Sequence, residues 1–232
     1  MGCGFSAPAH ARGDGRRDVT LEDGATRRTR ARGRGRAREG ARASDARAGA
    51  EGRARVKLVL LGASAAGKTS VSARFARGTF SSECKATVGA AFASATREVD
   101  GGRVKFEIWD TAGQERYASL APLYYRGASA AMIVFDVTSR ESFERARYWA
   151  EELRRHGDPE CATTLVGNKT DLEERATTTS EAEALAEEFS MRGGYVECSA
   201  RTGAGVAEAF EAVGRDALAR VAGDAARDER DA

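Results

Sequence analysis

The chain has 232 residues, which suits one folded domain with extensions and is too short for two full domains. The formal net charge of +2 is unevenly spread: residues 1–55 contain 14 arginines against 7 acidic residues, so residues 56–232 carry a net charge of −5. No run approaches the roughly 18 consecutive apolar residues of a membrane span, and the first residues lack the apolar core of a secretory signal.

Cysteine usage excludes two further classes of protein. The four cysteines, Cys3, Cys84, Cys161 and Cys198, form no C-x-x-C pair, and the chain has only two histidines. This composition predicts neither a disulfide framework nor a zinc centre, and it indicates a reducing compartment.

The first 54 residues differ in composition from the rest. Residues 1–6, MGCGFS, fit the pattern M-G-x-x-x-[ST] for N-myristoylation of Gly2, and Cys3 beside it is a candidate for palmitoylation. Residues 7–54 are rich in Ala, Arg and Gly and contain no aromatic residue. Such a segment cannot bury enough apolar surface to offset its ordering entropy. We therefore expect an acylation signal followed by a disordered leader.

From residue 56 onward, strand-like and helix-like segments alternate. Strands are expected over residues 56–61, 92–99, 104–110, 130–136, 162–168 and 194–198, and helices over residues 68–77, 140–156, 180–189 and 206–221. Asp100-Gly101-Gly102 is typical of a hairpin turn. The pattern predicts an α/β fold of the three-layer P-loop type, with a mostly parallel six-stranded sheet and helices on both faces. This domain is expected to span residues 55–222, before a short charged tail over residues 223–232.

The first expected strand is followed directly by the motif G-x-x-x-x-G-K-T, which runs from Gly62 to Thr69. A strand, a tight loop and a helix in this order direct backbone N–H groups and the positive end of the helix dipole toward one anion. Lys68 is then the point charge between the β- and γ-phosphates of a nucleotide, and the Thr69 hydroxyl is a ligand of Mg²⁺. The residues expected to hold the phosphates are Gly62, Ala63, Ser64, Ala65, Ala66, Gly67, Lys68, Thr69 and Ser70.

A second motif, WDTAGQE at residues 109–115, begins in the last two residues of the strand that ends at Asp110. Ligands of parallel sheets bind at the carboxyl ends of the strands, where a carboxylate facing a phosphate loop is a usual second anchor for Mg²⁺. Asp110 fits that role. Gly113 can bring its backbone N–H to the γ-phosphate with no side chain in the way, and Gln114 can orient the attacking water.

A third motif, NKTD at residues 168–171, indicates which base is bound. The Asp171 carboxylate can accept hydrogen bonds from N1–H and the 2-amino group of guanine, which adenine does not offer. Asn168 would brace the surrounding loops, the Lys169 stem would lie along the base, and Ala200 would donate its backbone N–H to the guanine O6. The residues expected around the base are Asn168, Lys169, Asp171, Ser199, Ala200 and Arg201.

With these motifs, residues 56–222 resemble a Ras-superfamily small GTPase, and within it a Rab. Residues 109–117, WDTAGQERY, and residues 124–128, YYRGA, are close to Rab hallmarks. Residues 62–68, GASAAGK, and residues 87–92, TVGAAF, resemble the early-endosomal, fifth-numbered Rab group. The last cysteine is Cys198, so we expect no C-terminal prenylation. Together with the acylation signal, this resembles the plant-lineage branch of that group, which is acylated at the N-terminus.

The resemblance implies a switch that binds GTP or GDP with Mg²⁺, hydrolyses GTP slowly and recruits effectors for endosomal vesicle trafficking and membrane fusion. Thr87 would ligate Mg²⁺, Phe80 would pack against guanine, and the two switches would lie around residues 79–92 and 111–127. The residues that would face effectors are Phe92, Trp109 and Tyr124. Expected partners are an exchange factor, a GTPase-activating protein and effectors. We expect a monomer on the cytoplasmic face of endosomal membranes or the plasma membrane.

Other interpretations remain open at this point. The Arg-rich residues 27–42 are compatible with nucleic-acid binding, although they offer no aromatic residue for base stacking. A nucleotide-binding scaffold without turnover is a second possibility, against which Thr69, Thr87, Asp110 and Gln114 argue. An Arf-type GTPase is also myristoylated, but DTAGQE and the tyrosine pair favour a Rab. The acidic residues of the leader fit an organellar transit peptide poorly.

Overall fold

The computed structural model of the chain describes residues 53–83 and 85–228. The expected acylation signal with Gly2 and Cys3, nearly all of the expected leader, Cys84 and residues 229–232 lie outside the described residues.

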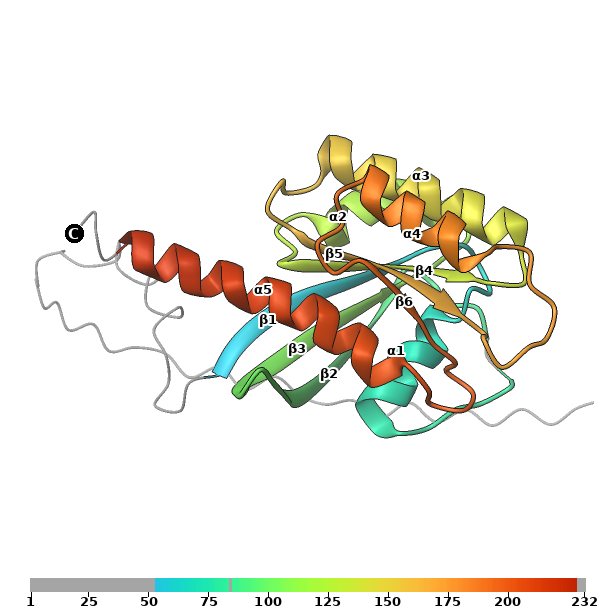
Figure 1. Ribbon diagram of the computed structural model, residues 1–232, viewed down its shortest axis with the longest axis horizontal. Helices are drawn as coiled ribbons and strands as arrows, with labels where there is room; N and C mark the ends of the chain where they lie inside the picture. The colour runs from blue at the N-terminus through green and yellow to red at the C-terminus, as the bar shows by residue number, and fades with distance from the viewer. Residues whose placement is uncertain (1–52, 84, 229–232) are drawn as a thin grey trace, which may run out of the picture. The chain divides into compact units, whose positions relative to one another are not determined.

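A six-stranded sheet with the order β2-β3-β1-β4-β5-β6 forms the centre of the domain (Figure 1). Neighbouring strands pair in parallel except β2 and β3, which form the expected antiparallel hairpin. The predicted α/β fold with a mostly parallel six-stranded sheet is therefore confirmed. The strands are β1 (Arg53–Leu61), β2 (Ala90–Val99), β3 (Gly102–Thr111), β4 (Ala130–Asp136), β5 (Ala162–Asn168) and β6 (Tyr195–Glu197).

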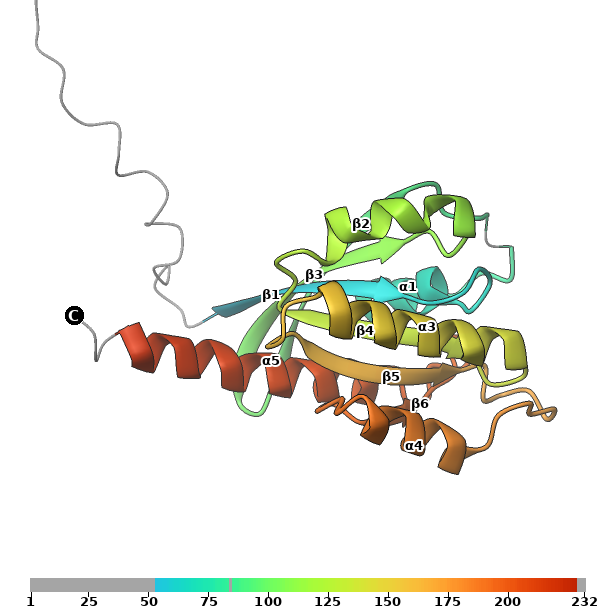
Figure 2. The same cartoon turned by 90° about the horizontal axis from the view of Figure 1, so that it is seen from above.

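Helices cover both faces of this sheet, as Figure 2 shows. The buried residues of α1 and α5 pack on one face of the sheet, and those of α2, α3 and α4 pack on the other. No helix in the described part of the chain is long and apolar enough to cross a bilayer. The helices are α1 (Lys68–Arg77), the 3-10 helix η1 (Glu115–Leu120), α2 (Ala121–Tyr125), α3 (Arg140–His156), α4 (Thr179–Glu188) and α5 (Val206–Asp228).

Side-chain caps place the start of two of these helices. The Ser139 hydroxyl accepts from the backbone N–H of Ser142 at the start of α3. Thr178 and Glu181 form a capping box at the start of α4. Both devices satisfy N–H groups that a helix leaves unpaired in its first turn. Each cap follows a strand and its loop, so the caps limit how far those two loops extend.

Several boundaries differ from the sequence-based expectations. β1 begins at Arg53 because residues 53–55 pair with residues 103–105 of β3, although the sequence Arg-Ala-Arg shows no apolar pattern. Likewise β2 begins at Ala90, which pairs with Thr111. α5 continues beyond residue 221 to Asp228, through an Ala-rich stretch of high helix propensity. The short helices η1 and α2, in the segment 115–125, were not predicted because neither is long enough to show a helical period.

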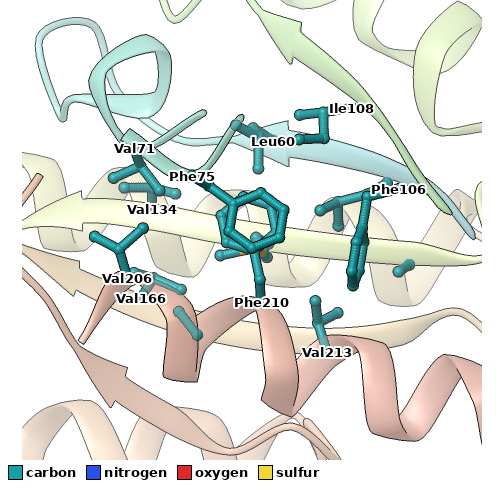
Figure 3. Close-up of a cluster of buried hydrophobic side chains, with 14 of the residues drawn as sticks. Leu60, Val71, Phe75, Phe106, Ile108, Val134, Val166, Val206, Phe210 and Val213 are labelled. Atoms are coloured by element: carbon teal, nitrogen blue, oxygen red, sulfur yellow. The ribbon is translucent and has the colours of Figure 1, made fainter. Parts of the chain in front are cut away.

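Three phenylalanines hold α1 and α5 against the sheet (Figure 3). The rings of Phe75 in α1 and Phe210 in α5 stack with centroids 3.6 Å apart. Phe106 of β3 packs edge-on against both, at 5.4 Å from Phe75 and 5.8 Å from Phe210. This cluster joins the helix that begins at Lys68 to the last helix of the domain, so it fixes one side of the site described below.

Replacing Phe210 with alanine is expected to lower the free energy of unfolding by about 3–5 kcal/mol, because it removes a fully buried ring and leaves a cavity. Urea denaturation followed by tryptophan fluorescence measures this change. Phe92, which is 58% exposed, provides the matched control, and Phe92→Ala should cost about 1 kcal/mol or less. Equal losses for the two variants would contradict the assignment of the core.

Candidate functional site

A cavity of about 460 Å³ lies at the carboxyl ends of the parallel strands, and all three motifs contribute to it. Five residues that were predicted for the site do not line this cavity: Gly62, Ala63, Ala66, Asp110 and Ser199. The predicted residues that line it are Ser64, Ala65, Gly67, Lys68, Thr69, Ser70, Phe80, Thr87, Gly113, Gln114, Asn168, Lys169, Asp171, Ala200 and Arg201.

Six lining residues were not named from the sequence: Ser81, Ser82, Lys85, Ala86, Thr111 and Leu172. The first four lie within the expected first switch, and Thr111 and Leu172 each follow a predicted carboxylate by one residue. All six residues could therefore have been identified from the sequence, because each lies in the expected first switch or next to a predicted carboxylate.

The phosphate loop connects β1 to α1 and presents donors to the cavity. α1 begins after Gly67, a residue that has no side chain to cap the first turn of the helix. Lys68 is 5% exposed, and its Nζ donates to the carbonyl oxygens of Gly62 at 3.0 Å and Ala63 at 2.7 Å. Burial lowers the pKa of Lys68 to about 8, against the opposing charge of Asp110. An ammonium group held this way is well placed to receive an anion.

Three side-chain oxygens from distant parts of the chain meet beside this loop. The Thr69 hydroxyl donates to Oδ2 of Asp110 at 2.6 Å and lies 3.0 Å from the Thr87 hydroxyl. Asp110 is 2% exposed, and its Oδ1 is buried with no hydrogen-bond partner within residues 53–83 and 85–228. Burial raises the pKa of Asp110, while the Thr69 hydrogen bond and the Lys68 charge oppose the rise. Hydroxyl and carboxylate oxygens are preferred Mg²⁺ ligands, so this donor set fits Mg²⁺.

The segment after β3 approaches the phosphate loop closely at Gly113. A Cβ atom at this position would overlap the Ala63 carbonyl oxygen and the Lys68 Nζ, so only glycine fits there. Gln114 follows as the N-cap of η1 and lines the same cavity. The two residues therefore stand where the end of a bound phosphate chain would be.

At the opposite end of the cavity, Asn168 and Asp171 organise the loops that were predicted to hold the base. Asn168 Nδ2 donates to the Ala66 carbonyl oxygen at 2.9 Å, and its Oδ1 accepts from the Ala200 N–H at 3.0 Å. The N–H that was predicted to meet the guanine O6 is thus engaged by Asn168. The Ser199 hydroxyl donates to Oδ1 of Asp171 at 2.6 Å, which fixes the orientation of that carboxylate.

The side chain of Lys169 extends from the loop after β5 to Asp136, the last residue of β4. The Lys169 backbone has a positive φ of 71°, and its Nζ pairs with Oδ2 of Asp136 at 2.6 Å. Burial acts to raise the pKa of Asp136, but hydrogen bonds from Lys169 and Thr138 outweigh burial and hold the pKa below its usual value. Phe80, 38% exposed, lines the same cavity. An apolar methylene stem and an aromatic ring are suited to the faces of a purine.

The three aromatic residues predicted to face effectors are neighbours in the fold. Phe92 of β2 pairs in register with Trp109 of β3, and their ring centroids are 5.4 Å apart. The Tyr124 ring of α2 lies 5.9 Å from that of Trp109. Trp109 and Tyr124 are partly buried against the core under α2 and α3, whereas Phe92 is exposed. The trio therefore forms a continuous aromatic surface at the β2 edge of the sheet.

Comparison with known proteins agrees with this geometry. Residues 57–219 match the model of the Ras family. The chain is 52% identical over 155 residues to the Ras-related protein Rab5 of Nicotiana tabacum, which covers 66% of this chain and 76% of that protein. It is 51% identical over 160 residues to the Ras-related protein RABF2b of Arabidopsis thaliana, which covers 68% of this chain and 79% of that protein. The chain therefore belongs to the Ras family and is a small GTPase of the Rab5 type, which binds GTP or GDP with Mg²⁺.

Proposed function

We propose that this GTPase hydrolyses GTP in the 460 Å³ cavity and acts as a membrane-anchored switch in endosomal trafficking. The observation that supports the assignment of the site is the convergence of three motifs, separated by up to about a hundred residues, on one cavity. The phosphates would lie on residues 62–70, and guanine would lie between Phe80, Lys169, Asp171 and the loop 199–201. Thr69, Thr87 and Asp110 would hold Mg²⁺.

Within that site, Gln114 is the residue proposed to act directly in catalysis. It would orient a water molecule in line with the bond between the γ-phosphorus and the β–γ bridging oxygen, which breaks as the new P–O bond forms. Lys68 and the N–H groups of the loop would stabilise charge on the phosphate oxygens, and Mg²⁺ when bound supplies further positive charge there. Intrinsic turnover of this kind is slow, on the order of 10⁻⁴–10⁻² s⁻¹, and an activating protein accelerates it.

The partners of the Rab family are an exchange factor, an activating protein and effectors. We assign effector contact to Phe92, Trp109 and Tyr124, because exposed aromatic clusters are frequent centres of protein interfaces. The proposed anchor is myristoylated Gly2 with palmitoylated Cys3, which would hold the protein on endosomal membranes or the plasma membrane.

Gln114→Leu is expected to slow single-turnover GTP hydrolysis by at least about tenfold, because leucine cannot orient water. Phosphate release from GTP-loaded protein measures the rate constant. The affinity for GTP should change little, which separates loss of catalysis from loss of binding. An unaffected rate would contradict the role assigned to Gln114.

Asp171→Asn is expected to weaken GDP binding by about a hundredfold, because it removes two charge-assisted acceptor bonds to the base. An asparagine amide can instead donate to the 2-oxo group of xanthine. Titration with labelled GDP and xanthosine diphosphate should therefore show the preference reversed. If the variant kept the wild-type preference for GDP, guanine would not be read by Asp171.

Gly2→Ala is expected to move the protein from the membrane pellet to the soluble fraction of the cells that express it, because N-myristoylation requires glycine at this position. Cys3→Ser should cause a partial shift, since one myristoyl chain binds membranes with an association constant of only about 10⁴ M⁻¹. Persistent pelleting of Gly2→Ala would rule out the proposed anchor.

A further inference from the structure

Arg74, in the last turn of α1, contacts the guanine-binding loop from the side that does not face the nucleotide cavity. Its Nε donates to the Ala200 carbonyl oxygen at 2.9 Å, and its Nη2 donates to the Arg201 carbonyl oxygen at 2.6 Å. Its third nitrogen, Nη1, donates to the Gly78 carbonyl oxygen at 2.8 Å. One guanidinium therefore holds three backbone carbonyls, two of which are 126 and 127 residues away in the chain.

The hydrogen bonds of Arg74 fix the direction of one backbone donor, the N–H group of Arg201. In a trans peptide, the C=O and N–H groups point in opposite directions from the same plane. The Ala200 carbonyl faces Arg74, so the Arg201 N–H, which belongs to the same peptide, points away from Arg74. Ala200 and Arg201 line the 460 Å³ cavity, whereas Arg74 lines a separate cavity of about 260 Å³ beside Phe75 and Phe210. The Arg201 N–H is thereby directed toward the larger cavity.

The Arg74 side chain also contacts the segment that leads to Phe80, which forms the other wall of the proposed base site. Gly78 ends α1, and its N–H donates to the Arg74 carbonyl oxygen at 2.9 Å while its own carbonyl accepts from Arg74 Nη1. Two residues later, Phe80 lines the larger cavity. Arg74 thus fixes the start of the Phe80 segment and the 200–201 loop relative to each other.

We propose that Arg74 is a positioning residue for guanine recognition, which aims the Arg201 N–H at the O6 atom of the base and sets the spacing between the two walls of the base site. This inference rests on the proposed function, because it requires guanine in the larger cavity. In the described loop, the N–H groups of Ser199, Ala200, Thr202 and Gly203 all donate to protein oxygens, and the Arg201 N–H is the donor that we assign to O6. Lysine can replace Arg74 only in part, because an ammonium group lacks the planar fork that spans three carbonyls.

The first test is the dissociation rate of fluorescent GDP from purified full-length protein, measured by displacement with excess GDP. Arg74→Ala should increase this rate by about tenfold or more, and Arg74→Lys should give an intermediate increase. Arg77→Ala is the matched control: it removes the same charge from the same helical turn at an exposed position, and it should stay within about twofold of wild type. Equal rates for Arg74→Ala and Arg77→Ala would overturn the inference.

The second test separates positioning of O6 recognition from general loosening of the fold. Wild-type protein should release 6-thio-GDP faster than GDP, because sulfur at position 6 is a weaker acceptor, and it should release inosine diphosphate faster because Asp171 loses the 2-amino group. The 6-thio effect is the release rate of 6-thio-GDP divided by that of GDP, and the inosine effect is the same ratio for inosine diphosphate. In Arg74→Ala the 6-thio effect should fall by at least about threefold, since coupled perturbations are non-additive. The inosine effect should stay within about twofold of its wild-type value. If both effects shrank equally, Arg74 would only stabilise the fold, and the inference would be wrong.

Should Arg74→Ala fail to fold, the same pair of ratios measured on Arg74→Lys decides the matter, with a reduced 6-thio effect as the expected result. The proposed function has its own outcome in these experiments. If wild-type protein did not bind GDP, both proposals would fail. If wild-type protein bound GDP and released the two analogues as expected, but Arg74→Ala matched it, only the role of Arg74 would be refuted.

Discussion

The buried amide of Asn168 joins the part of the site that would hold phosphates to the part that would hold the base. It donates to the Ala66 carbonyl oxygen of the phosphate loop and accepts from the Ala200 N–H of the last loop. A Cβ atom at Gly67 would overlap Asn168 Nδ2, so the loop must carry glycine there for the amide to reach Ala66. The residue is 2% exposed, and an unpaired buried amide is costly. The two halves of the site therefore cannot shift independently without breaking these bonds.

Two buried charged side chains couple the stability of the fold to ligand binding. Lys68 and Asp110 are almost fully buried, and burial shifts the pKa of each toward its neutral form. Lys68 donates to carbonyls of its own loop, while Oδ1 of Asp110 has no partner in the described part of the chain. A phosphate group and Mg²⁺ would stabilise both charged forms. A ligand that binds only the folded state also raises the free energy of unfolding, so nucleotide binding and stability are coupled.

Sequence predicted the parts of the site that depend on short stretches of chain. The phosphate loop, Asp110 and the NKTD segment each follow a strand whose apolar run is evident, so their positions could be inferred from the common edge of a parallel sheet. The contacts of Arg74 with Ala200 and Arg201 could not be inferred, because they cross 126 residues or more and no local pattern marks them. The start of β1 at Arg53 depends on its partner β3, and η1 and α2 are too short for a helical period. Long-range pairing and short elements limited the prediction.

The link between the nucleotide site and the aromatic surface follows from one backbone bond between the expected switches. The Ala112 N–H, beside Gly113, donates to the Gly89 carbonyl oxygen at 2.8 Å, two residues after Thr87. From there the β2–β3 ladder continues from Ala90 and Thr111 to Phe92 and Trp109. A displacement of Thr87 or Gly113 by a bound γ-phosphate would therefore act on both strands that carry these rings. Phe92 is 58% exposed and contributes less to the core than a buried ring would, so its ring is accessible for the proposed contact with an effector.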